Sequence, residues 1–447
     1  MTEPLILKQR DSKTIRAWYM FDWANSAYNL VITTTFFPIY FAGITEAAYG
    51  ENSVPFLGRT FKNSSLYDYA LATAYLFIAI LLPILSSIAD SYGNKKKFMQ
   101  FFCYLGGLSC IGLFWFKGEQ PSVAWGLLCF MLAAIGYIGS LVFYNSYLPE
   151  IAKPEDHDRI SAKGFSFGYL GGAAMQIIGF GLVVYFSAHD DNTSGPLFTF
   201  LFVGIWWIGF AQITFFSLPK SQVPVRSDTN FLIAGFIELK KVWVQIKALK
   251  VLKWFLVAFL FYSMGVQTVM LAATLFGQQA LGLPADKLIL TILLMQIVAV
   301  AGATIISRLS KRFGNIMVLM GVVLLWIAIC VAAYLIATMK EYGHDVELYF
   351  YVLAAGVGLI MGGVQALSRS TYSKLMPPTR DTASFFSFYD VTEKISIVVG
   401  IFTFGYIDEI FGMKNSVLML IVFFALGFSA LLMAKREESY TQVTGHE

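Results

Sequence analysis

The sequence predicts an all-α polytopic membrane protein, with twelve transmembrane helices in two pseudo-symmetric six-helix bundles. Three observations support this fold class: the composition, the apolar runs, and a repeat at one fixed offset. Of the 447 residues, 57% are apolar, 16% are aromatic and only 13% are charged, and the mean hydropathy is +0.65. A soluble domain carries about 25% charged residues, so this composition indicates a chain that lies mostly in lipid.

Apolar runs long enough to cross about 30 Å of hydrocarbon recur along the whole chain. They lie at residues 17–43, 68–89, 98–116, 122–148, 164–187, 197–217, 253–279, 288–306, 315–338, 348–367, 384–406 and 415–434. Six runs precede a longer polar stretch and six follow it. The predicted domains are therefore an N-terminal tail (1–16), a first bundle (17–217), a linker (218–252), a second bundle (253–434) and a C-terminal tail (435–447).

A repeat relates the two bundles. Residues 87–94 read SIADSYGN, and residues 308–315, which lie 221 positions later, read RLSKRFGN. The tripeptide FSF at 165–167 returns at 386–388 with the same offset. Two matches at one offset indicate a half duplicated head to tail, which is typical of secondary transporters.

Lys and Arg residues predict the orientation, because short cytoplasmic loops retain them and translocated loops do not. With twelve spans both termini lie on one side, and that side holds most of the 32 basic residues. The opposite loops hold Arg59, Lys62, Lys117, Lys287, Lys340 and Lys414, and Lys394 lies inside the eleventh span. We therefore expect both termini in the cytoplasm. The net charge of +4 reflects this orientation and gives no reason to expect a nucleic-acid partner.

Several classes of protein are disfavoured. The first apolar run is too long for a cleaved signal peptide, and no GxxxxGK[ST] pattern indicates ATP binding. The four cysteines fall within spans as apolar packers, and the four histidines fall in loops or the tail, so no buried imidazole is expected. We expect no enzyme activity, cofactor or metal. The compact loops and short tails favour a bacterial inner (plasma) membrane, and we expect a monomer.

The linker carries its own helical pattern. Leu232, Phe236, Leu239, Trp243, Ile246 and Leu249 recur at helical spacing, and Lys240, Lys241 and Lys247 fall elsewhere. This pattern suits an amphipathic helix on the anionic inner leaflet. A passive connector is an equal alternative.

Polar side chains recur at helical spacing in four spans, although a polar group in hydrocarbon is costly unless it finds a partner or a wet cavity. The stripes comprise Asp22, Asn25, Ser26, Asn29 and Thr33 in span 1; Tyr137, Ser140, Tyr144, Asn145 and Tyr147 in span 4; Ser263, Gln267, Thr274 and Gln278 in span 7; and Gln365, Ser368, Arg369 and Tyr372 in span 10. These spans are equivalent in a repeat of three within six, so we expect them around one central polar path. Alternatively, each residue only bonds a neighbouring helix, at about 0.6 kcal/mol.

Acidic residues are scarce within the spans. Asp22, Asp390 and Glu393 lie clearly inside them, and an uncompensated charge there costs about 2.5–3.5 kcal/mol. Asp390 lies three positions before Glu393 and four before Lys394, so all three can share a helix face. We hypothesise that Lys394 keeps one carboxylate ionised while the other binds a proton or a cationic substrate. The alternative is a structural ion pair.

The repeated loop resembles a motif of the major facilitator superfamily. Residues 86–95, with Asp90, Gly93 and Lys95, resemble its loop between helices 2 and 3, and the stretch around Gly314 resembles the second copy. Lys311 replaces the acid there. The resemblance implies the major facilitator fold and a gating function in which Asp90 caps helix 11 in one state; a carboxylate at a helix N-terminus gains about 0.3–1 kcal/mol.

A narrower resemblance covers most of the chain. The matching stretches are 18–28 (WYMFDWANSAY), 143–149 (FYNSYLP), 160–172 (ISAKGFSFGYLGG), 261–269 (FYSMGVQTV), 362–372 (GGVQALSRSTY) and 385–389 (FFSFY). They resemble the vacuole-effluxer branch of the superfamily, which includes autophagy-related amino-acid effluxers. The resemblance implies release of amino acids in eukaryotic members and leaves the substrate of bacterial members open.

Together these observations predict a secondary active transporter of a small polar solute, with amino acids as the leading class and proton coupling left open. The expected solute contacts are Asp22, Asn25, Ser26, Asn29, Tyr144, Asn145, Gln267 and Gln365. Arg369 could meet a carboxylate, or act as a cytoplasmic gate or phosphate anchor. The alternatives are an exporter of lipophilic or cationic compounds and a non-transporting membrane receptor or scaffold.

Overall fold

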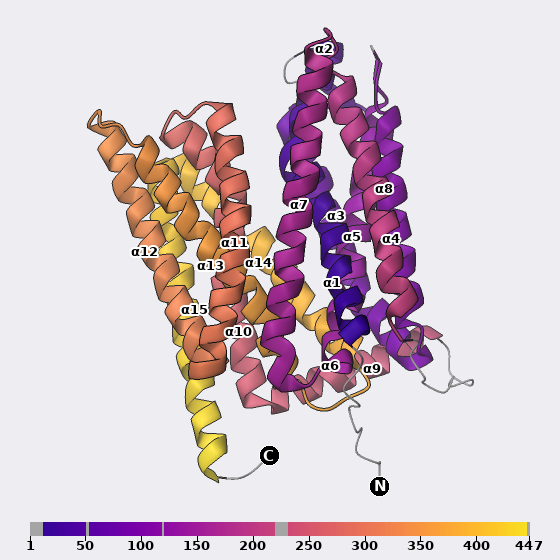
Figure 1. Ribbon diagram of the computed structural model, residues 1–447, viewed down its shortest axis with the longest axis vertical. Coiled ribbons are helices and arrows are strands. Elements are labelled where there is room, and N and C mark those ends of the chain that lie inside the picture. Colours follow the sequence, from indigo (N-terminus) through magenta and orange to yellow (C-terminus); the bar gives the residue numbers. More distant parts are fainter. Residues whose placement is uncertain (1–11, 51–52, 119, 220–230, 445–447) are drawn as a thin grey trace. The chain divides into compact units, whose positions relative to one another are not determined.

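The computed structural model describes residues 12–50, 53–118, 120–219 and 231–444, and most of them are helical (Figure 1). Eleven helices in these ranges are long and apolar enough to cross a membrane. The predicted eleventh span is α14 (Thr382–Phe411), which falls outside that set because Asp390, Glu393 and Lys394 lie in it. The described residues form two compact units: the N-terminal unit (12–147, 167–219 and 231–235) and the C-terminal unit (148–166 and 236–444).

The N-terminal unit is an all-helical bundle with one small hairpin. Its elements are α1 (Ser12–Ala27), η1 (Tyr28–Phe36), α2 (Phe37–Tyr49), β1 (Val54–Phe56), β2 (Arg59–Phe61), α3 (Asn63–Tyr92), α4 (Lys95–Gly112), η2 (Leu113–Trp115), α5 (Val123–Ser146), most of α7 (His157–Ser187), and α8 (Ser194–Ser217). The hairpin turns at Leu57 and Gly58, whose positive φ angles of 49° and 76° suit a two-residue turn between antiparallel strands.

The first span changes its helical geometry midway. Between α1 and α2, the segment η1 is a π-helix, and the Phe37 N–H bonds to the Ile32 carbonyl, five residues earlier. Pro38 follows, and a proline in a helix removes one N–H donor and clashes with the carbonyl four residues earlier. The π-helix begins one turn after Asn25 and contains Asn29 and Thr33 of the same polar stripe.

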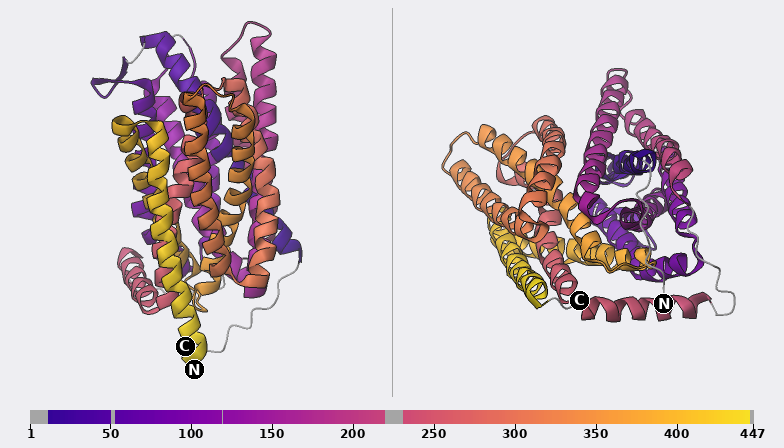
Figure 2. Two further views of the ribbon diagram at one scale, coloured as in Figure 1. Left: turned by 90° about the vertical axis from the view of Figure 1, so that its left-hand side faces the viewer. Right: turned by 60° about the horizontal axis from the view of Figure 1, so that its bottom comes forward.

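The C-terminal unit is a second helical bundle. Its elements are α6 (Leu148–Ile151), η3 (Pro154–Asp156), the first turns of α7, α9 (Phe231–Ala248) from Phe236 on, α10 (Lys250–Leu275), η4 (Phe276–Ala280), α11 (Ala285–Phe313), α12 (Asn315–Glu341), α13 (Glu347–Leu375), α14 and α15 (Met413–Thr444). Figure 2 shows that α9 lies across the direction of the long helices of this unit. The α7 helix contributes residues to both units.

Close helix packing depends on glycines. A Cβ added at Gly136 on α5 would lie 2.5 Å from the Gly106 backbone on α4. In the C-terminal unit, a Cβ at Gly302 on α11 would lie 1.8 Å from the Leu359 carbonyl oxygen on α13. Small residues allow helix backbones to approach closely in membranes, where packing replaces the hydrophobic effect as the driving force.

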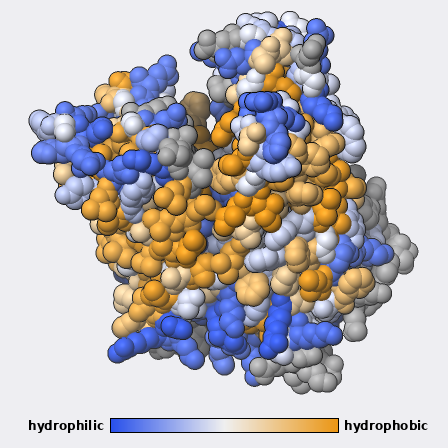
Figure 3. Space-filling view, turned by 45° about the horizontal axis from the view of Figure 1, so that its top comes forward, coloured by the Kyte–Doolittle hydropathy of each residue, from blue (hydrophilic) through white to orange (hydrophobic). Residues whose placement is uncertain are grey.

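The outer surface of the helices is apolar. Figure 3 shows hydrophobic residues over the middle of the helices and hydrophilic residues toward their ends. Ile80 on α3, Leu108 on α4, Leu324 on α12 and Phe402 on α14 are at least half exposed. Exposed apolar area on this scale marks a membrane-contacting surface.

The structure corrects one expectation. His157 was expected in a loop, but it begins α7 and is 1% exposed, so the chain does contain a buried imidazole. In the apolar stripe of the linker, Ile246 is buried and Trp243 is 45% exposed, so protein covers only part of the stripe. The side chains of Leu232, Phe236 and Thr274 lie outside the described residues.

Candidate functional site

A buried polar pair joins α1 and α5 in the N-terminal unit. The Tyr144 hydroxyl donates a 2.6 Å hydrogen bond to Asp22 Oδ2, and both side chains are buried. Trp18 fixes Tyr144, because the indole N–H donates to the Tyr144 carbonyl at 3.0 Å and the two rings stack with centroids 4.4 Å apart. Two of the predicted solute contacts therefore lie together, joined by a charge-assisted hydrogen bond.

Asn25 lies one turn further along α1. Its side chain is 1% exposed, and among the described residues neither its amide nitrogen nor its amide oxygen has a hydrogen-bond partner. An unsatisfied buried polar group costs about 1–3 kcal/mol, and such groups in folded proteins call for a water, an ion or another specific explanation. Asn25 can therefore both donate to and accept from a bound molecule.

The remaining candidates of this unit are less distinctive. Asn145 is buried, and Ser26 and Asn29 are half-buried. Ser26 lies against α7, where a Cβ added at Gly168 would lie 2.6 Å from its hydroxyl oxygen. Ser26 therefore contributes to helix packing as well as to the polar stripe.

Sequence reasoning missed a buried amide beside the π-helix. Gln176 on α7 is fully buried and donates to the Thr35 hydroxyl at 3.2 Å. Thr34 and Thr35 each donate to the Leu30 carbonyl at 2.8 Å, which satisfies an acceptor in a segment of irregular helix. The sequence does contain a signal that could have identified this residue, because Gln176 is a lone amide within an apolar span.

Glu393 on α14 joins two partners in the C-terminal unit. Lys394 Nζ lies 2.6 Å from Glu393 Oε2, and Gln267 on α10 donates to Glu393 Oε1 at 3.0 Å. The side chains of Lys394 and Glu393 are 8% and 16% exposed, and Asp390 is 2% exposed. The ion pair forms between chain neighbours, which helical spacing does not anticipate.

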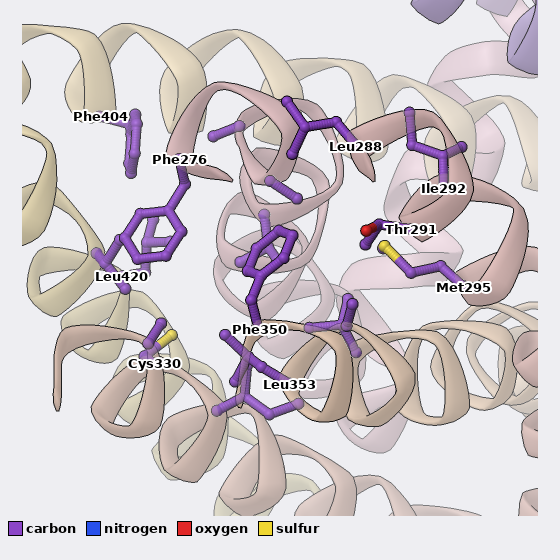
Figure 4. Close-up of a pocket in the computed structure, with 18 residues that line it drawn as sticks. Phe276, Leu288, Thr291, Ile292, Met295, Cys330, Phe350, Leu353, Phe404 and Leu420 are labelled. Carbon is purple, nitrogen blue, oxygen red and sulfur yellow. The ribbon is translucent and has the colours of Figure 1, made fainter. Parts of the chain in front are cut away.

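A small, partly open cavity in the C-terminal unit is apolar. It has a volume of about 60 Å³ and is lined by side chains such as Phe276, Leu288, Met295 and Phe350 (Figure 4). The hydroxyl of Thr291 donates to the Lys287 carbonyl at 2.8 Å. A polar solute here would lose its hydrogen bonds to water without replacement, so this cavity is not a polar solute site.

The other polar residues of this unit bond to one another. Tyr262 on α10 hydrogen bonds to Ser368 on α13 at 2.7 Å. Gln365 on α13 donates to the Met270 sulfur on α10 at 3.2 Å, which is a weak acceptor. These contacts fit the alternative in which polar residues join helices, and Gln365 retains the capacity to form stronger bonds.

Asp158, near the start of α7, is a buried carboxylate with several hydrogen-bond donors around it. The sequence did not predict this cluster. The Asp158 carboxylate accepts from Ser310 at 2.7 Å, Asn315 at 2.8 Å and Lys374 at 2.6 Å. Ser310 and Asn315 belong to the second copy of the repeated loop, in which the exposed Lys311 replaces the acid. Asp158 therefore brings a carboxylate from another segment to the loop that lacks one.

Arg369 lies within α13, which continues to Leu375, beyond the predicted end of that span. Arg369 is 2% exposed, and its guanidinium donates to the hydroxyl and the carbonyl of Ser161 at 2.9 and 3.0 Å. It also lies 4.2 Å from the centre of the Phe165 ring. These contacts tie the first turns of α7 to α13.

The first copy of the loop is also well packed. Asp90 and Lys95 are 5% and 2% exposed, and Lys95 Nζ lies 5.0 Å from the centre of the Tyr147 ring. Gly93 and Gly314 have φ angles of 64° and 84°, which favour glycine. Within the described ranges, no group of three His, Cys, Asp or Glu side chains is placed to hold a metal ion.

Comparisons with solved structures identify the fold. The proton:xylose symporter XylE superposes with a TM-score of 0.70 at 12% identity, covering 96% of each chain. The human organic anion transporter MFSD10 superposes with a TM-score of 0.68 at 12% identity, covering 94% of this chain and 99% of that one. The chain therefore has the major facilitator fold, and the predicted twelve-helix fold is confirmed.

Sequence comparisons identify the family. Residues 10–444 match the family described as "Vacuole effluxer Atg22 like". The chain is 30% identical over 438 residues to the MFS-type transporter YxiO of Bacillus subtilis (strain 168), covering 97% of each. It is 24% identical over 466 residues to Autophagy-related protein 22 of Saccharomyces cerevisiae (strain ATCC 204508 / S288c), covering 90% of this chain and 87% of that protein. The chain belongs to the vacuole effluxer Atg22-like family, whose members are transporters rather than enzymes.

Proposed function

We propose that this protein is a secondary active transporter that moves amino acids by alternating access. The observation that carries the proposal is Asn25, a fully buried amide with no hydrogen-bond partner among the described residues, one turn from the Asp22–Tyr144 pair. A polar solute would satisfy this amide. Membership in a family of effluxers supports the transport activity itself.

Amino acids suit the charges of the polar residues. A zwitterion needs a partner for its ammonium and another for its carboxylate, and an unpaired charge at membrane depth costs several kcal/mol. Asp22 offers an anion to the ammonium, and the Asn25 amide can donate to the carboxylate. In the C-terminal unit, Glu393 and Lys394 supply charges of both signs.

Proton coupling is assigned to the charged residues of α14. Lys394 and Gln267 keep Glu393 ionised, and the other carboxylate, Asp390, binds the proton. Asp390→Asn should abolish the pH dependence of transport and leave downhill exchange of solute intact. Transport that keeps its full pH dependence in this variant would rule out the coupling function.

Flux into proteoliposomes tests the proposal, using a panel of radiolabelled amino acids with and without a protonophore. We expect uptake of at least one amino acid and its loss in Asp22→Asn. A matched control is Asp156→Asn, because Asp156 forms a surface pair with Arg159 and should not affect transport. Flux of a lipophilic cation alone would favour the exporter alternative, and no flux of any solute would favour a receptor.

The remaining features of the proposal concern placement and gating. The 30% identical relative from Bacillus supports a bacterial plasma membrane, and the distribution of Lys and Arg supports cytoplasmic termini. We propose that the chain acts as a monomer. Asp90, Lys95 and Gly93 in one loop, and Lys311, Gly314 and Arg369 near the other, would change contacts as the transporter opens and closes.

A further inference from the structure

The α9 helix is held at the level where the next span enters the membrane. A single residue, Leu249, separates α9 from α10, and its φ and ψ angles of −81° and 91° break the helix there. One residue spans at most about 3.6 Å, and α10 is a membrane-spanning helix from Lys250 on. Because α9 lies across the long helices (Figures 1 and 2), it runs along the membrane boundary.

One side of α9 is fixed to the C-terminal unit. Val242 and Ile246 are 0% and 2% exposed. Trp243 stacks on Phe388 of α14 with centroids 5.6 Å apart, and Lys241 forms a 3.0 Å ion pair with Asp381. These contacts set the rotation of α9 about its own axis and therefore determine which residues face away from the unit.

The opposite side alternates apolar and basic residues. Ile237, Lys240, Val244 and Lys247 follow one another at spacings of three and four, so they share a helix face. Ile237 and Val244 are 61% and 58% exposed, and both lysines are exposed. Among the described side chains, no carboxylate pairs with Lys240 or Lys247, and Lys247 lies 4.8 Å from the centre of the Trp243 ring.

We propose that the face formed by Ile237, Lys240, Val244 and Lys247 binds the headgroups of anionic phospholipids in the leaflet where α10 enters the membrane. The lysines would pair with lipid phosphates, and the two aliphatic side chains would insert among the first acyl carbons. Lipid is favoured over a soluble partner because the tether to α10 keeps the whole of α9 at the membrane boundary, and because the exposed face combines lysines with aliphatic side chains. Interfacial helices with basic and apolar residues insert about 5–10 Å into this region.

A spin label at position 237 tests the proposal in the full-length protein. Ile237→Cys is labelled and reconstituted in phosphatidylcholine vesicles with or without phosphatidylglycerol, and the accessibility of the label to oxygen and to a water-soluble nickel chelate is measured. The four native cysteines are buried, and the unsubstituted chain serves as the labelling blank. Leu57→Cys, at the 86% exposed hairpin tip, is the matched control outside the helix.

We expect phosphatidylglycerol to lower the ratio of chelate to oxygen accessibility at position 237 at least threefold, with no change at position 57. Adding Lys240→Gln and Lys247→Gln, or about 1 M salt, which reduces the Debye length to about 3 Å, should remove this difference. Equal accessibility in both lipid mixtures would overturn the proposal. A label at position 237 that is already inaccessible to the chelate in detergent would also overturn the proposal, because the protein itself would then cover this face. The same holds if the label becomes inaccessible only when a soluble protein is added.

Discussion

At the scale of single residues, a substitution at Asn25 shows whether this side chain binds the solute or stabilises the fold. Because its amide has no partner among the described residues, replacing it with the similarly sized Leu removes an unsatisfied polar group. We expect Asn25→Leu to leave the Tm unchanged or raise it. We expect the KM for the transported solute to rise about 5- to 100-fold, which corresponds to the loss of a hydrogen bond worth about 1–3 kcal/mol. Thermal unfolding and initial uptake rates measure the two effects.

Gln176→Leu is the matched control, because that amide is equally buried but donates to Thr35. This substitution should lower the Tm and leave the KM unchanged. If Asn25→Leu instead lowered the Tm as Gln176→Leu does, with an unaltered KM, Asn25 would be a structural residue.

The sequence could single out the candidates of α1 and α5, because polar residues in hydrocarbon are conspicuous. It did not predict which of them lie together. Asp22 and Tyr144 are 122 positions apart, and only the packing of α1 on α5 brings them to 2.6 Å. It also missed Asp158, because an acid in a predicted loop carries no signal until the loop proves to be buried.

At the scale of elements, the contact between α11 and α13 depends on the absence of a side chain at Gly302. We expect Gly302→Ala to force the helices apart and cost about 1–3 kcal/mol, because overpacking strains the backbone. Gly321→Ala on α12 is the control, since its added Cβ would meet nothing within 4 Å. Comparing the two thermal unfolding curves in detergent checks this prediction. Similar curves would contradict the close approach.

The start of α7 is anchored by Asp158. We expect Asp158→Asn to weaken three hydrogen bonds and leave the Lys374 ammonium, 25% exposed, without its carboxylate. The free energy of unfolding should fall by about 1–3 kcal/mol. A cysteine probe at Ala162 should become more reactive, since that residue is only 3% exposed. Unchanged reactivity would show that α7 is held by other contacts.

The α9 helix shows why an amphipathic pattern does not identify its partner. The apolar stripe was expected on lipid, but protein covers Ile246, and Trp243 of the same stripe is 45% exposed. A helical wheel reports which face avoids water and gives no information on what the face contacts. The exposed Ile237 and Val244 fall outside the stripe, so the pattern alone could not single them out.

At the scale of the whole molecule, an even number of spans predicts that both ends lie on one side. A fluorescent protein fused after residue 447 should fluoresce in a bacterial host, and alkaline phosphatase inserted near Tyr342 should be active. The physical reason is that the loops near Lys340 are poor in Lys and Arg and are therefore translocated. Alkaline phosphatase that is active when it is fused after residue 447 would contradict the predicted orientation.

The fold class and its twelve spans could be predicted because lipid imposes strict lengths on apolar helices. The helix ends could not. The α7 helix begins at His157, seven residues before the predicted span at Gly164, because Asp158 and Ser161 find partners on other helices and continue the helix beyond the hydrocarbon. The apolar composition of a segment predicts which residues cross the membrane. It does not predict the polar contacts that extend a helix beyond the membrane.

The π-helix at Tyr28–Phe36 has a consequence for how this chain could change by insertion and deletion. A π-turn holds one more residue than an α-turn, so losing one residue there would restore ordinary helix without shortening the hydrogen-bonded ladder. The helices on either side would keep their register, and the side chains within the segment would change position relative to Asp22 and Asn25. Homologues of unequal length in this segment would therefore present different side chains to the same solute, and a gap at this point in an alignment would indicate a change in specificity.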